Sequence, residues 1–499
     1  MEERDIVIVG SGFAGLGAAI RLTKSGRHDF VVLERGSDVG GTWRDNDYPG
    51  CRCDVPSHLY SFSFAPNPDW TASFSPQQEI QAYLQRTATA LGIRPHLRLN
   101  TELLDAQWNH VEQRWHVTTN NGDYSARILV LGTGALSEPS IPSLPGLDTF
   151  AGTTFHSASW RWDHDLGGRR VAVVGTGASA VQFVPHVQRQ AAQLTLFQRT
   201  APWVMSRRDR EIGRLERRLY RRFPFLQRLT RAGIYAGREG LVLGLAKAPG
   251  ILKVGEWAAL RFLEKQVPDP ELRAKLTPHY RLGCKRILLA NDYYPALTQP
   301  NVEVATDRIA EVLPHAVVTE DANGLRREHD VDTIIFGTGF HVTDPPIAAK
   351  LRDADGRRLA EHWSNGMTAH RGLTVAGFPN MFFLIGPNTG LGHNSIVLMI
   401  EAQVRYLLDV LEQMDARNIG ALAPRPEVQS AYNDKLQRAL THTVWNTGGC
   451  ASWYLDGNGR NTTLWPTFTF TFHKEMWRCD LTEYAVEPRV DQPARVPAA

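Results

Sequence analysis

The chain has 499 residues, which is long enough for about three globular domains, each with a core of its own. With 42% hydrophobic and 21% charged residues it has the composition of an ordinary globular enzyme, and its formal net charge of +3 is too small to indicate binding to nucleic acid. The longest apolar stretch, GLVLGLAKAPGIL from Gly240, is too short to cross a membrane and contains a lysine.

The first predicted element is a buried strand over Asp5–Val9, and its early position leaves no room for a secretory signal. The cysteines are an odd number without the spacing of a zinc site: Cys51, Cys53, Cys284, Cys450 and Cys479. We therefore expect a cytoplasmic protein with reduced cysteines, rather than a disulfide scaffold, and no metal site.

This first strand leads into a glycine-rich turn and a helix of small residues, in the order that binds a dinucleotide. Gly10, Gly12 and Gly15 allow a tight turn and close approach of the backbone to a pyrophosphate, which would lie at the helix N-terminus. A second strand over Phe30–Leu33 ends at Glu34, whose carboxylate can bind both hydroxyls of an unphosphorylated ribose. The unit predicts a site for an ADP moiety without a 2′-phosphate, as in FAD or NAD.

A second unit of the same kind begins with RRVAVVGTGASAVQFV. Arg199 follows Gly175 by 24 residues, the same interval that separates Glu34 from Gly10. Because an acid suits a bare ribose and an arginine suits a 2′-phosphate, we expect NADP in this unit. The residues expected to bind it are Gly175, Thr176, Gly177, Ser179, Ala180, Arg199 and Thr200.

The segment from Arg207 to Gly240 is rich in arginine, with ten arginines and three acids up to Arg231. Apolar side chains recur in it at helical spacing: Ile212, Leu215, Leu219 and Phe223. We interpret the segment as an inserted helical subdomain with a solvated face. The alternative is a basic amphipathic helix that lies on an anionic membrane surface.

Two further strands end in glycine pairs, within Ile128–Gly146 and Asp332–Phe340, and each marks a crossing between domains. A late segment, Phe378–Leu407, predicts a strand, a Gly/Asn loop with Asn388, and a long helix from near Ser395. We therefore expect an α/β fold with two Rossmann-like dinucleotide-binding domains, for FAD and NADP, the second inserted in the first, plus a helical insertion. The expected ranges are 1–145 and 341–499 for the FAD-binding domain, with a mobile C-terminal loop and tail, 146–207 and 276–340 for the NADP-binding domain, and 208–275 for the helical insertion.

Together these motifs resemble the class B flavoprotein monooxygenases, and in particular their Baeyer–Villiger type, over essentially the whole chain. Their signature Phe-x-Gly-x-x-x-His-x-x-x-Trp is matched within FAGTTFHSASWRWD by Phe150, Gly152, His156 and Trp160. Arg161 departs from it, since Pro or Asp follows the Trp in the family's pattern. The resemblance implies that this segment is a hinge into the NADP-binding half, organised by His156 and Trp160.

Other segments are similar to the family's cofactor-contacting loops. Gly40–Trp43 and Tyr48–Asp54 resemble the flavin-contacting segment, and Gly283–Arg286 resembles the loop that brings a lysine to the 2′-phosphate. The segment CASWYLDGNGRNTTLWP resembles the mobile C-terminal loop. The implied FAD-binding residues are Gly10, Gly12, Phe13, Gly15, Glu34, Gly41, Thr42, Trp43, Asp54, Tyr60 and Asn388, and the resemblance adds Arg52, Lys285 and Trp453 to the NADP-binding residues.

The resemblance implies a reaction in which NADPH reduces the flavin, O₂ forms a peroxyflavin, and a ketone becomes an ester or lactone. Arg286 is the implied catalytic cation, because arginine stays protonated in proteins. At about 4 Å and an effective dielectric constant of about 20, such a cation stabilises a unit negative charge by roughly 4 kcal/mol before desolvation. Asp54 is implied to orient Arg286.

Three alternatives remain open at this point. One is a flavin-containing monooxygenase that oxidises sulfur or nitrogen. Another is an NADPH-dependent disulfide reductase using Cys51 and Cys53, for which CxC is a poor spacing. The third is a membrane-surface flavoprotein that would use 207–240. The expected partners are a small ketone and O₂, with no nucleic acid.

Overall fold

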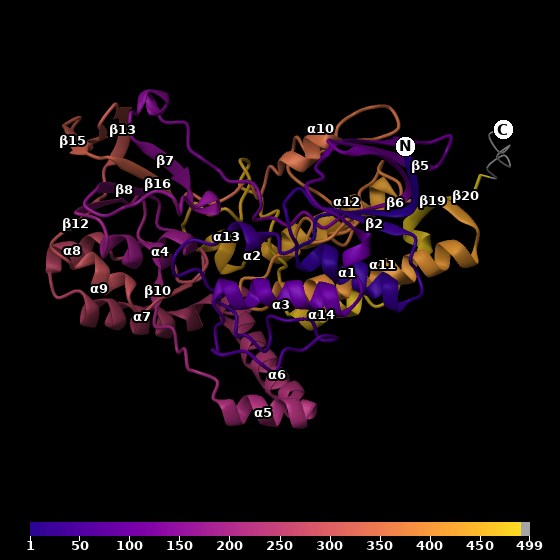
Figure 1. Ribbon diagram of the computed structural model, residues 1–499, viewed down its shortest axis with the longest axis horizontal. Coiled ribbons are helices and arrows are strands. Elements are labelled where there is room, and N and C mark those ends of the chain that lie inside the picture. The colour runs from indigo at the N-terminus through magenta and orange to yellow at the C-terminus, as the bar shows by residue number, and fades with distance from the viewer. Residues whose placement is uncertain (491–499) are drawn as a thin grey trace.

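The computed structural model describes residues 1–490, which form two α/β lobes and a helical hairpin that projects away from them (Figure 1). The larger lobe contains an eight-stranded sheet in the order β17-β4-β5-β6-β1-β2-β3, with β18 beside β6. Its strands are β1 (Glu2–Val9), β2 (Phe30–Leu33), β3 (Leu97–Arg98), β4 (Leu103–Asn109), β5 (Arg114–Thr119), β6 (Gly122–Leu131), β17 (Leu351–Arg352) and β18 (Met381–Phe383).

The smaller lobe contains a five-stranded parallel sheet in the order β12-β9-β8-β16-β7. Its strands are β7 (Thr153–His156), β8 (Arg170–Val174), β9 (Gln193–Phe197), β12 (Val302–Ala305) and β16 (Thr333–Phe336). Three smaller sheets hold β10 (Val204–Met205) with β11 (Leu288–Leu289), β13 (Arg308–Leu313) with β14 (Ala316–Glu320) and β15 (Arg326–Asp330), and β19 (Ile419–Pro424) with β20 (Tyr484–Pro488).

Helices cover the faces of both main sheets, as buried parallel strands require (Figure 1). The helices of residues 1–490 are α1 (Phe13–Lys24), α2 (Thr42–Asp45), α3 (Gln77–Ala90), α4 (Ala178–Gln188), α5 (Arg214–Arg222), α6 (Pro224–Glu239), α7 (Leu252–Gln266), α8 (Pro270–Lys275), α9 (Tyr293–Leu297), α10 (Leu359–His362), α11 (Ile396–Ala416), α12 (Pro426–Leu440), α13 (Val444–Thr447) and α14 (Thr469–Glu475), of which α5 and α6 form the projecting hairpin (Figure 1). The long predicted helix begins as expected, because the Ser395 hydroxyl accepts a hydrogen bond from the Val397 N–H at its N-terminus.

The two main sheets share one arrangement around their glycine-rich turns. In the larger sheet β1 lies between β2 and β6, and in the smaller sheet β8 lies between β9 and β16, with β3 and β12 at equivalent outer positions. The chain enters the smaller sheet at β7, leaves it after β16, and returns to the larger sheet with β17 beside β4. The predicted α/β class with two Rossmann-like units is therefore confirmed.

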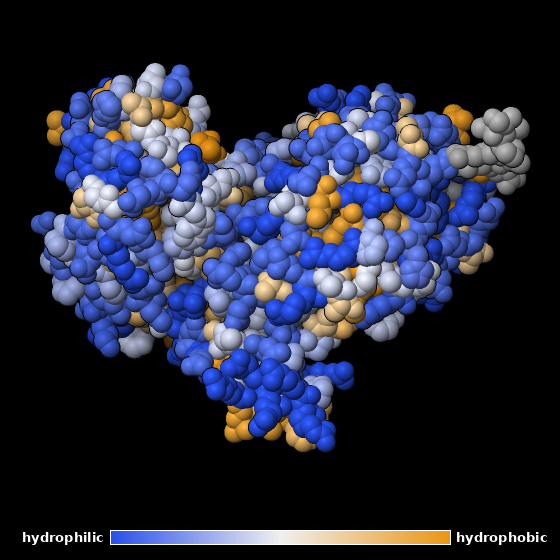
Figure 2. Space-filling model, in the orientation of Figure 1, coloured by the Kyte–Doolittle hydropathy of each residue, from blue (hydrophilic) through white to orange (hydrophobic). Residues whose placement is uncertain are grey.

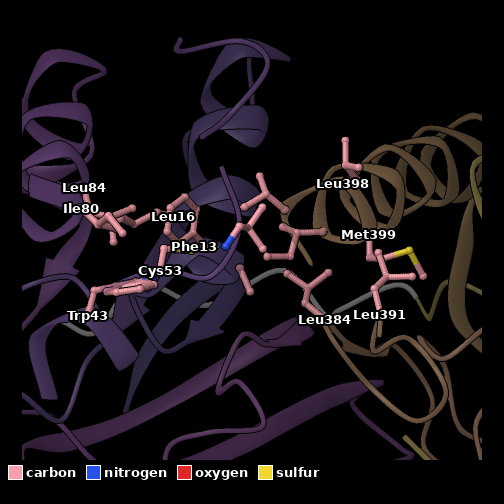
Figure 3. Close-up of a cluster of buried hydrophobic side chains, with 14 of the residues drawn as sticks. Phe13, Leu16, Trp43, Cys53, Ile80, Leu84, Leu384, Leu391, Leu398 and Met399 are labelled. Carbon is pink, nitrogen blue, oxygen red and sulfur yellow. Dashed lines mark hydrogen bonds between the residues drawn. The ribbon is translucent and has the colours of Figure 1, made fainter. Parts of the chain in front are cut away.

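Close packing of α1 on β1 depends on glycine. A Cβ atom on Gly15 would lie 1.8 Å from the carbonyl oxygen of Gly10, and Gly10 itself has φ +93°. Figure 3 shows the core that forms around this helix: Phe13 and Leu16 of α1 lie between side chains of α3 and side chains of α11. The labelled partners are Ile80, Leu84, Leu398 and Met399.

The strand registers correct one sequence-based expectation. Val9 pairs with Leu33 in the larger sheet, and Val174 pairs with Phe197 in the smaller sheet. The second unit is therefore one residue shorter between its two strands, so the equivalent of Glu34 is Gln198. Gln198 is buried, and Arg199 lies one residue beyond it on the surface. Arg199 therefore does not occupy the position of Glu34, although each follows the first glycine of its turn by 24 residues.

The arginine-rich segment forms two consecutive helices, α5 and α6, which pack against each other at an angle (Figure 1), rather than one amphipathic helix. Ile212 is buried ahead of α5, whereas Leu215, Leu219 and Phe223 are exposed. Figure 2 shows hydrophobic residues at the lower end of this hairpin, next to a strongly hydrophilic surface. Within residues 1–490, none of the helices combines the length and the apolar character that a membrane span requires.

The cysteines differ from the expectation of fully reduced thiols. Cys284 and Cys450 form a disulfide across 166 positions, while Cys51, Cys53 and Cys479 are free and buried. The expectation was wrong for the first pair because it counted cysteines and could not place two distant loops side by side. The expected C-terminal tail includes 491–499, which lie outside the described residues.

Candidate active site

The predicted flavin side is built on the turn that joins β1 to α1. Gly41 has φ +52°, and a Cβ atom on it would lie 3.1 Å from the Cα of Gly12, so loop 40–43 packs directly on the turn. The Gly40 N–H also donates to the Ser11 carbonyl oxygen at 3.0 Å. Thr42 lies at the other side of this loop, with its hydroxyl 3.4 Å from the Leu136 carbonyl oxygen.

Glu34 is buried at the end of β2, where the sequence predicts a ribose-binding acid. Its carboxylate accepts hydrogen bonds from the Ser11 N–H and hydroxyl, from the Gly36 N–H and from Arg44. Burial alone would raise the pKa of Glu34, but the charge of Arg44 and these hydrogen bonds lower it below its usual value. The carboxylate is therefore held ionised beside the glycine-rich turn.

Three of the predicted flavin-contacting aromatic residues lie together. The Trp43 indole N–H donates to the Tyr60 hydroxyl at 3.1 Å, and the rings of Phe13 and Tyr60 meet edge to face with centroids 5.0 Å apart. Figure 3 shows Phe13, Trp43 and Cys53 in one cluster. These contacts bring residues from three separate segments to the same side of the turn, and make a rigid apolar wall there.

The predicted NADP side is built on the turn that joins β8 to α4. Gly175 has φ +108°, and a Cβ atom on it would lie 2.5 Å from the Gly337 carbonyl oxygen. The Thr176 hydroxyl donates to the Thr200 carbonyl oxygen at 3.0 Å, which ties the turn to the loop after β9. Ala180 is buried in the first turn of α4, while Gly177 is exposed and Ser179 is half-buried.

Two cations lie beside this second turn without an anionic partner. Arg199 forms no ion pair or hydrogen bond within residues 1–490. Lys285 is half-buried over the ring of Tyr280, with its ammonium 5.2 Å from the ring centroid. Burial, followed by the charge of Arg199, lowers the pKa of Lys285, which shows that the two cations are close enough to repel each other.

The predicted catalytic residues form a bidentate ion pair between two distant segments. The Arg286 Nη2 donates to Asp54 Oδ1 at 2.6 Å, and its Nε donates to Oδ2. Both side chains are about one quarter exposed. Burial alone would raise the pKa of Asp54 and lower that of Arg286, but the mutual charge and hydrogen bonds reverse both shifts. The pair is therefore ionised, and three of the five guanidinium N–H donors remain outside it.

The signature segment connects the smaller sheet to the flavin side. His156 is buried at the end of the edge strand β7, where its Nδ1 accepts a hydrogen bond from the Ala158 N–H at 3.1 Å. Burial lowers its pKa to about 4, so the imidazole is neutral at pH 7. Trp160 packs against Phe183 of α4 with ring centroids 5.3 Å apart. His156 and Trp160 therefore organise packing and do not carry charge.

Other residues of this segment fix its ends. A Cβ atom on Gly152 would lie 2.4 Å from the Asp332 carbonyl oxygen, and Phe150 packs on the core of the smaller lobe. The indole N–H of Trp162 donates to Asp47 of the flavin side at 2.9 Å. Arg161, which departs from the signature, pairs with Asp163 on the surface and makes no contact with either turn.

Arg52 lies at the boundary between the two lobes. Its main-chain N–H donates to Gln182 Oε1 at 3.2 Å, and Gln182 Nε2 donates back to its carbonyl oxygen at 3.0 Å. Its guanidinium pairs with Asp209 at 2.5 Å. The sequence predicted a role for Arg52 on the NADP side but gave no sign of Gln182, whose amide joins α4 to the flavin segment.

The Gly/Asn loop and the C-terminal segment meet at Asn388. Asn388 has φ +57°, and its amide donates to the carbonyl oxygens of Asn461 and Leu464 at 2.7 and 3.1 Å. The predicted Trp453 is exposed, and its ring lies tilted against that of Tyr454, with ring centroids 4.4 Å apart. Tyr454, which the sequence did not single out, is the buried member of the two and lies near Arg286 and Asp54.

Cys51 and Cys53 are poorly suited to disulfide exchange. Both are buried and free, and burial raises the pKa of Cys51 to about 12 and that of Cys53 further above its usual value. Because the thiolate is the attacking form, these thiols are unreactive at pH 7. The geometry therefore opposes the disulfide-reductase hypothesis.

The residues present fit FAD and NADP. At Gly12 and Gly177 a Cβ atom would meet its nearest neighbours only at ordinary contact distance, 3.7 and 3.8 Å, so neither turn is tightly obstructed at the glycine that would approach a pyrophosphate. The buried carboxylate of Glu34 suits a ribose, and the unpaired charges of Arg199 and Lys285 suit a 2′-phosphate. Within residues 1–490, no group of three or more His, Cys, Asp or Glu side chains could hold a metal ion.

Two glycine-rich turns, one on a mixed sheet and one on a parallel sheet, together with an arginine–aspartate pair that joins two distant segments, define a flavoprotein with separate FAD and pyridine nucleotide sites. Residues 7–223 match the pyridine nucleotide-disulphide oxidoreductase family. The chain is 53% identical over 484 residues to a Baeyer–Villiger monooxygenase of Streptomyces coelicolor, and the match covers 96% of this chain and 92% of that one.

Solved structures agree with this relationship. A closed crystal structure of cyclohexanone monooxygenase superposes with a TM-score of 0.86 at 26% identity, covering 98% of this chain and 100% of that one. OTEMO in complex with FAD and NADP also gives a TM-score of 0.86, at 25% identity and 97% and 99% coverage. The chain belongs to the Baeyer–Villiger monooxygenase family. It is an NADPH-dependent flavin monooxygenase, with FAD and NADPH as its cofactors.

Proposed function

We propose that the protein inserts one oxygen atom of O₂ into the bond between the carbonyl carbon and a neighbouring carbon of a small ketone. In this reaction ketone, O₂, NADPH and H⁺ give an ester or lactone, NADP⁺ and water, so the second oxygen atom leaves as water. The observation that carries the proposal is the ionised Arg286–Asp54 pair, which joins the segment between α2 and α3 to the segment between α8 and β11. Bound FAD supplies the oxygen-activating chemistry once NADPH has reduced it.

Within this proposal Arg286 stabilises the negative charge that develops on the way to the product. It stays protonated through the reaction, and its three remaining N–H donors are available to an anionic oxygen. Asp54 fixes the plane of the guanidinium through two hydrogen bonds. Such fixed donors cost little reorganisation when charge appears, and removing one typically lowers the rate by about 10²–10³-fold.

Cofactor and domain assignments complete the proposal. Gly10, Gly12, Gly15, Glu34, Gly41, Thr42, Trp43, Tyr60 and Asn388 would hold FAD with Phe13 and Asp54, and Arg52, Gly175, Thr176, Gly177, Ser179, Ala180, Arg199, Thr200, Lys285 and Trp453 would hold NADP. The strand partners support 1–145 with 341–499 as the FAD-binding domain, because β17 and β18 pair with β4 and β6. Strand β16 pairs with β7 and with β8, which supports 146–207 with 276–340 as the NADP-binding domain. The helical insertion is 208–275.

A product analysis tests the proposed reaction. The purified holoenzyme is supplied with NADPH, ¹⁸O₂ and a panel of ketones and sulfides, and the products are identified by mass. We expect an ester or lactone that carries one ¹⁸O atom per NADPH consumed, and a large loss of that product in Arg286→Met. Sulfoxide as the only oxygenated product, with the rest of the NADPH accounted for by reduction of O₂ to hydrogen peroxide, would refute the proposal in favour of a heteroatom monooxygenase.

We also propose that the α5–α6 hairpin contacts an anionic membrane surface. Its tip exposes Leu215, Phe225 and Leu229, which are 71%, 62% and 67% exposed. The hairpin and the segment just before it also carry exposed arginines, of which Arg210 and Arg221 pair with acids: Arg208, Arg210, Arg214, Arg218, Arg221, Arg222 and Arg228. An apolar tip with a cationic border complements anionic headgroups over acyl chains, whereas the same border would repel a second copy of the hairpin.

Sedimentation with vesicles tests this contact. At low salt we expect binding to vesicles that contain phosphatidylglycerol and not to phosphatidylcholine alone, and a loss of about tenfold or more in Phe225→Ser/Leu229→Ser. The control, Val111→Ser/Leu325→Ser, removes two equally exposed apolar side chains outside the hairpin and should bind as the unmodified protein does. Equal binding of both variants would show that the hairpin is not the contact.

Finally, we propose a cytoplasmic location, because the reaction consumes NADPH, which cells regenerate there. The three free buried cysteines are compatible with a reducing compartment, although the Cys284–Cys450 disulfide is unusual for one. Fractionation of cells that express the full chain tests this: activity confined to the periplasmic or secreted fraction would refute it.

A further inference from the structure

Helix α6 begins at the exposed tip of the hairpin and ends at the predicted catalytic pair. A rise of about 1.5 Å per residue places its last turn roughly 20 Å from its first. Arg238, the penultimate residue, donates from Nε to the His393 carbonyl oxygen at 2.9 Å and from Nη2 to the Asp54 carbonyl oxygen at 3.4 Å. The inserted helix therefore delivers a second guanidinium to the segment that holds Asp54.

The end of α6 is fixed in this place by the next residue. Glu239 is buried and accepts hydrogen bonds from the Asn394 side chain at 2.7 Å and from the Thr469 N–H at 3.0 Å. These partners come from the Gly/Asn loop and from α14, so the helix end is held by two other elements. Because the end of α6 is held on both sides, the position of Arg238 relative to Asp54 is fixed.

Arg238 also changes the charge balance of the centre. Arg286 and Asp54 neutralise each other, and Arg238 has no carboxylate within ion-pair distance in the described residues. Burial, followed by nearby Arg286, disfavours its charged form, while Asp54 favours it. The cluster of Arg286, Asp54 and Arg238 thus keeps a net positive charge, and the ionised form of Asp54 is stabilised from both sides.

We propose that Arg238 is a positioning residue of the catalytic centre: it holds the Asp54 segment and keeps Asp54 ionised, so that Asp54 in turn holds Arg286. The inference rests on the proposed roles of Arg286 and Asp54. It adds a residue from the helical insertion to a site otherwise made by the two dinucleotide-binding units. Asp54 is faced by these titratable or charged groups: Arg286, Arg238, Cys53, Tyr48, Tyr60 and Tyr454.

A matched pair of variants tests this role. Arg231, two turns earlier on α6, is also largely buried and also donates to main-chain carbonyl oxygens, of His58, Leu59 and Ser61. Arg231→Met therefore removes a structural arginine of the same helix away from Asp54. In Arg238→Met we expect the acid limb of the activity profile to move up by about one pH unit, because removing a nearby cation raises the pKa of Asp54. We expect kcat to fall about tenfold, which is less than for loss of a direct donor.

Three further measurements make the test decisive. Arg238→Lys should restore the acid limb, and Arg231→Met should leave it unchanged at a similar melting temperature and FAD content. Asp54→Asn should abolish the pH effect, so that the acid limbs of Asp54→Asn and Asp54→Asn/Arg238→Met lie at the same pH. The pH dependence of the absorption spectrum of bound FAD reports the same shift without turnover, and so separates this inference from the proposed reaction. An unmoved acid limb in Arg238→Met, or an equal shift in Arg231→Met, would overturn it.

Discussion

Two cations without an anion, Lys285 and Arg199, are the clearest sign of a ligand at the scale of single residues. Burial, and after it the charge of Arg199, lowers the pKa of Lys285. Such an arrangement costs folding free energy unless a bound anion offsets it. A 2′-phosphate carries nearly two negative charges and suits two donors of this kind. We therefore expect these two side chains to decide between NADPH and NADH.

Replacing Lys285 by Met should therefore change cofactor preference rather than catalysis. The thioether side chain keeps most of the packing over Tyr280 and removes one charge-assisted hydrogen bond, typically about 1.5–3 kcal/mol. We expect the KM for NADPH to rise about tenfold or more, with the KM for NADH almost unchanged. Lys253→Met, at an exposed position of α7, is the control. Equal rises for both cofactors would contradict a role at the 2′-phosphate.

Buried histidines make a second residue-scale prediction, on stability against pH. Burial lowers the pKa of His156 to about 4, so the unfolded chain binds a proton between about pH 6.5 and 4 that the folded chain does not. Stability must therefore fall as the pH falls through this range, by about 2 kcal/mol at pH 5 for this group. The free energy of unfolding in urea should differ less between pH 7 and pH 5 in His156→Phe than in the unmodified chain. His28→Gln, on the surface, should show the full difference.

Some site residues could be found from the sequence and others could not, for physical reasons. Asp54 and Arg286 are 232 positions apart, and only their resemblance to a family motif joined them. Arg238 lies among many arginines, and nothing in their spacing distinguishes the arginines that are buried from those that are exposed. Gln198 replaced Arg199 at the equivalent strand position because a single residue is missing between β8 and β9, and residue counting cannot detect such a deletion.

At the scale of elements, glycine shows which parts of the fold are tight and which are open. In α1 the helix can approach β1 only because Gly15 has no side chain. In α6 a methyl group on either helix-interior glycine, Gly233 or Gly237, would have no neighbour within 4 Å, because that face is exposed. The sequence predicted the first from its motif, whereas the second appears only once the hairpin is seen to project from the molecule (Figure 1).

Two alanine substitutions should consequently have opposite effects. Gly15→Ala forces a methyl group within 1.8 Å of the Gly10 carbonyl oxygen, so we expect loss of bound FAD and a lower melting temperature. Gly233→Ala relieves the entropy cost of glycine in an open helix and should stabilise α6 by about 1 kcal/mol. Flavin content after gel filtration and thermal melting measure both. A Gly15→Ala protein that keeps its flavin and its stability would show that this turn can relax.

At the scale of the whole molecule, the two lobes share one continuous buried hydrophobic cluster, and specific polar and covalent links also join distant segments. Gln182 binds the main chain of Arg52, Trp162 binds Asp47, and the Cys284–Cys450 disulfide joins the loop before Lys285 to the C-terminal segment. The order of the elements could be predicted from the sequence, because strand and turn motifs are local. These links could not, because each depends on how two distant segments lie against each other.

The disulfide is the link with the largest expected effect on the whole molecule. It closes a loop between positions 166 apart, and such a cross-link removes unfolded-state entropy worth about 2–4 kcal/mol in typical proteins. We expect reductant to lower the melting temperature of the unmodified holoenzyme, and Cys284→Ser/Cys450→Ser to melt at that lower temperature with or without reductant. Cys479→Ser, at a free cysteine, should retain the response. Because Cys284 precedes Lys285 and Arg286, opening the bond should also raise the KM for NADPH; a reductant-independent melting temperature in the unmodified chain would contradict both expectations.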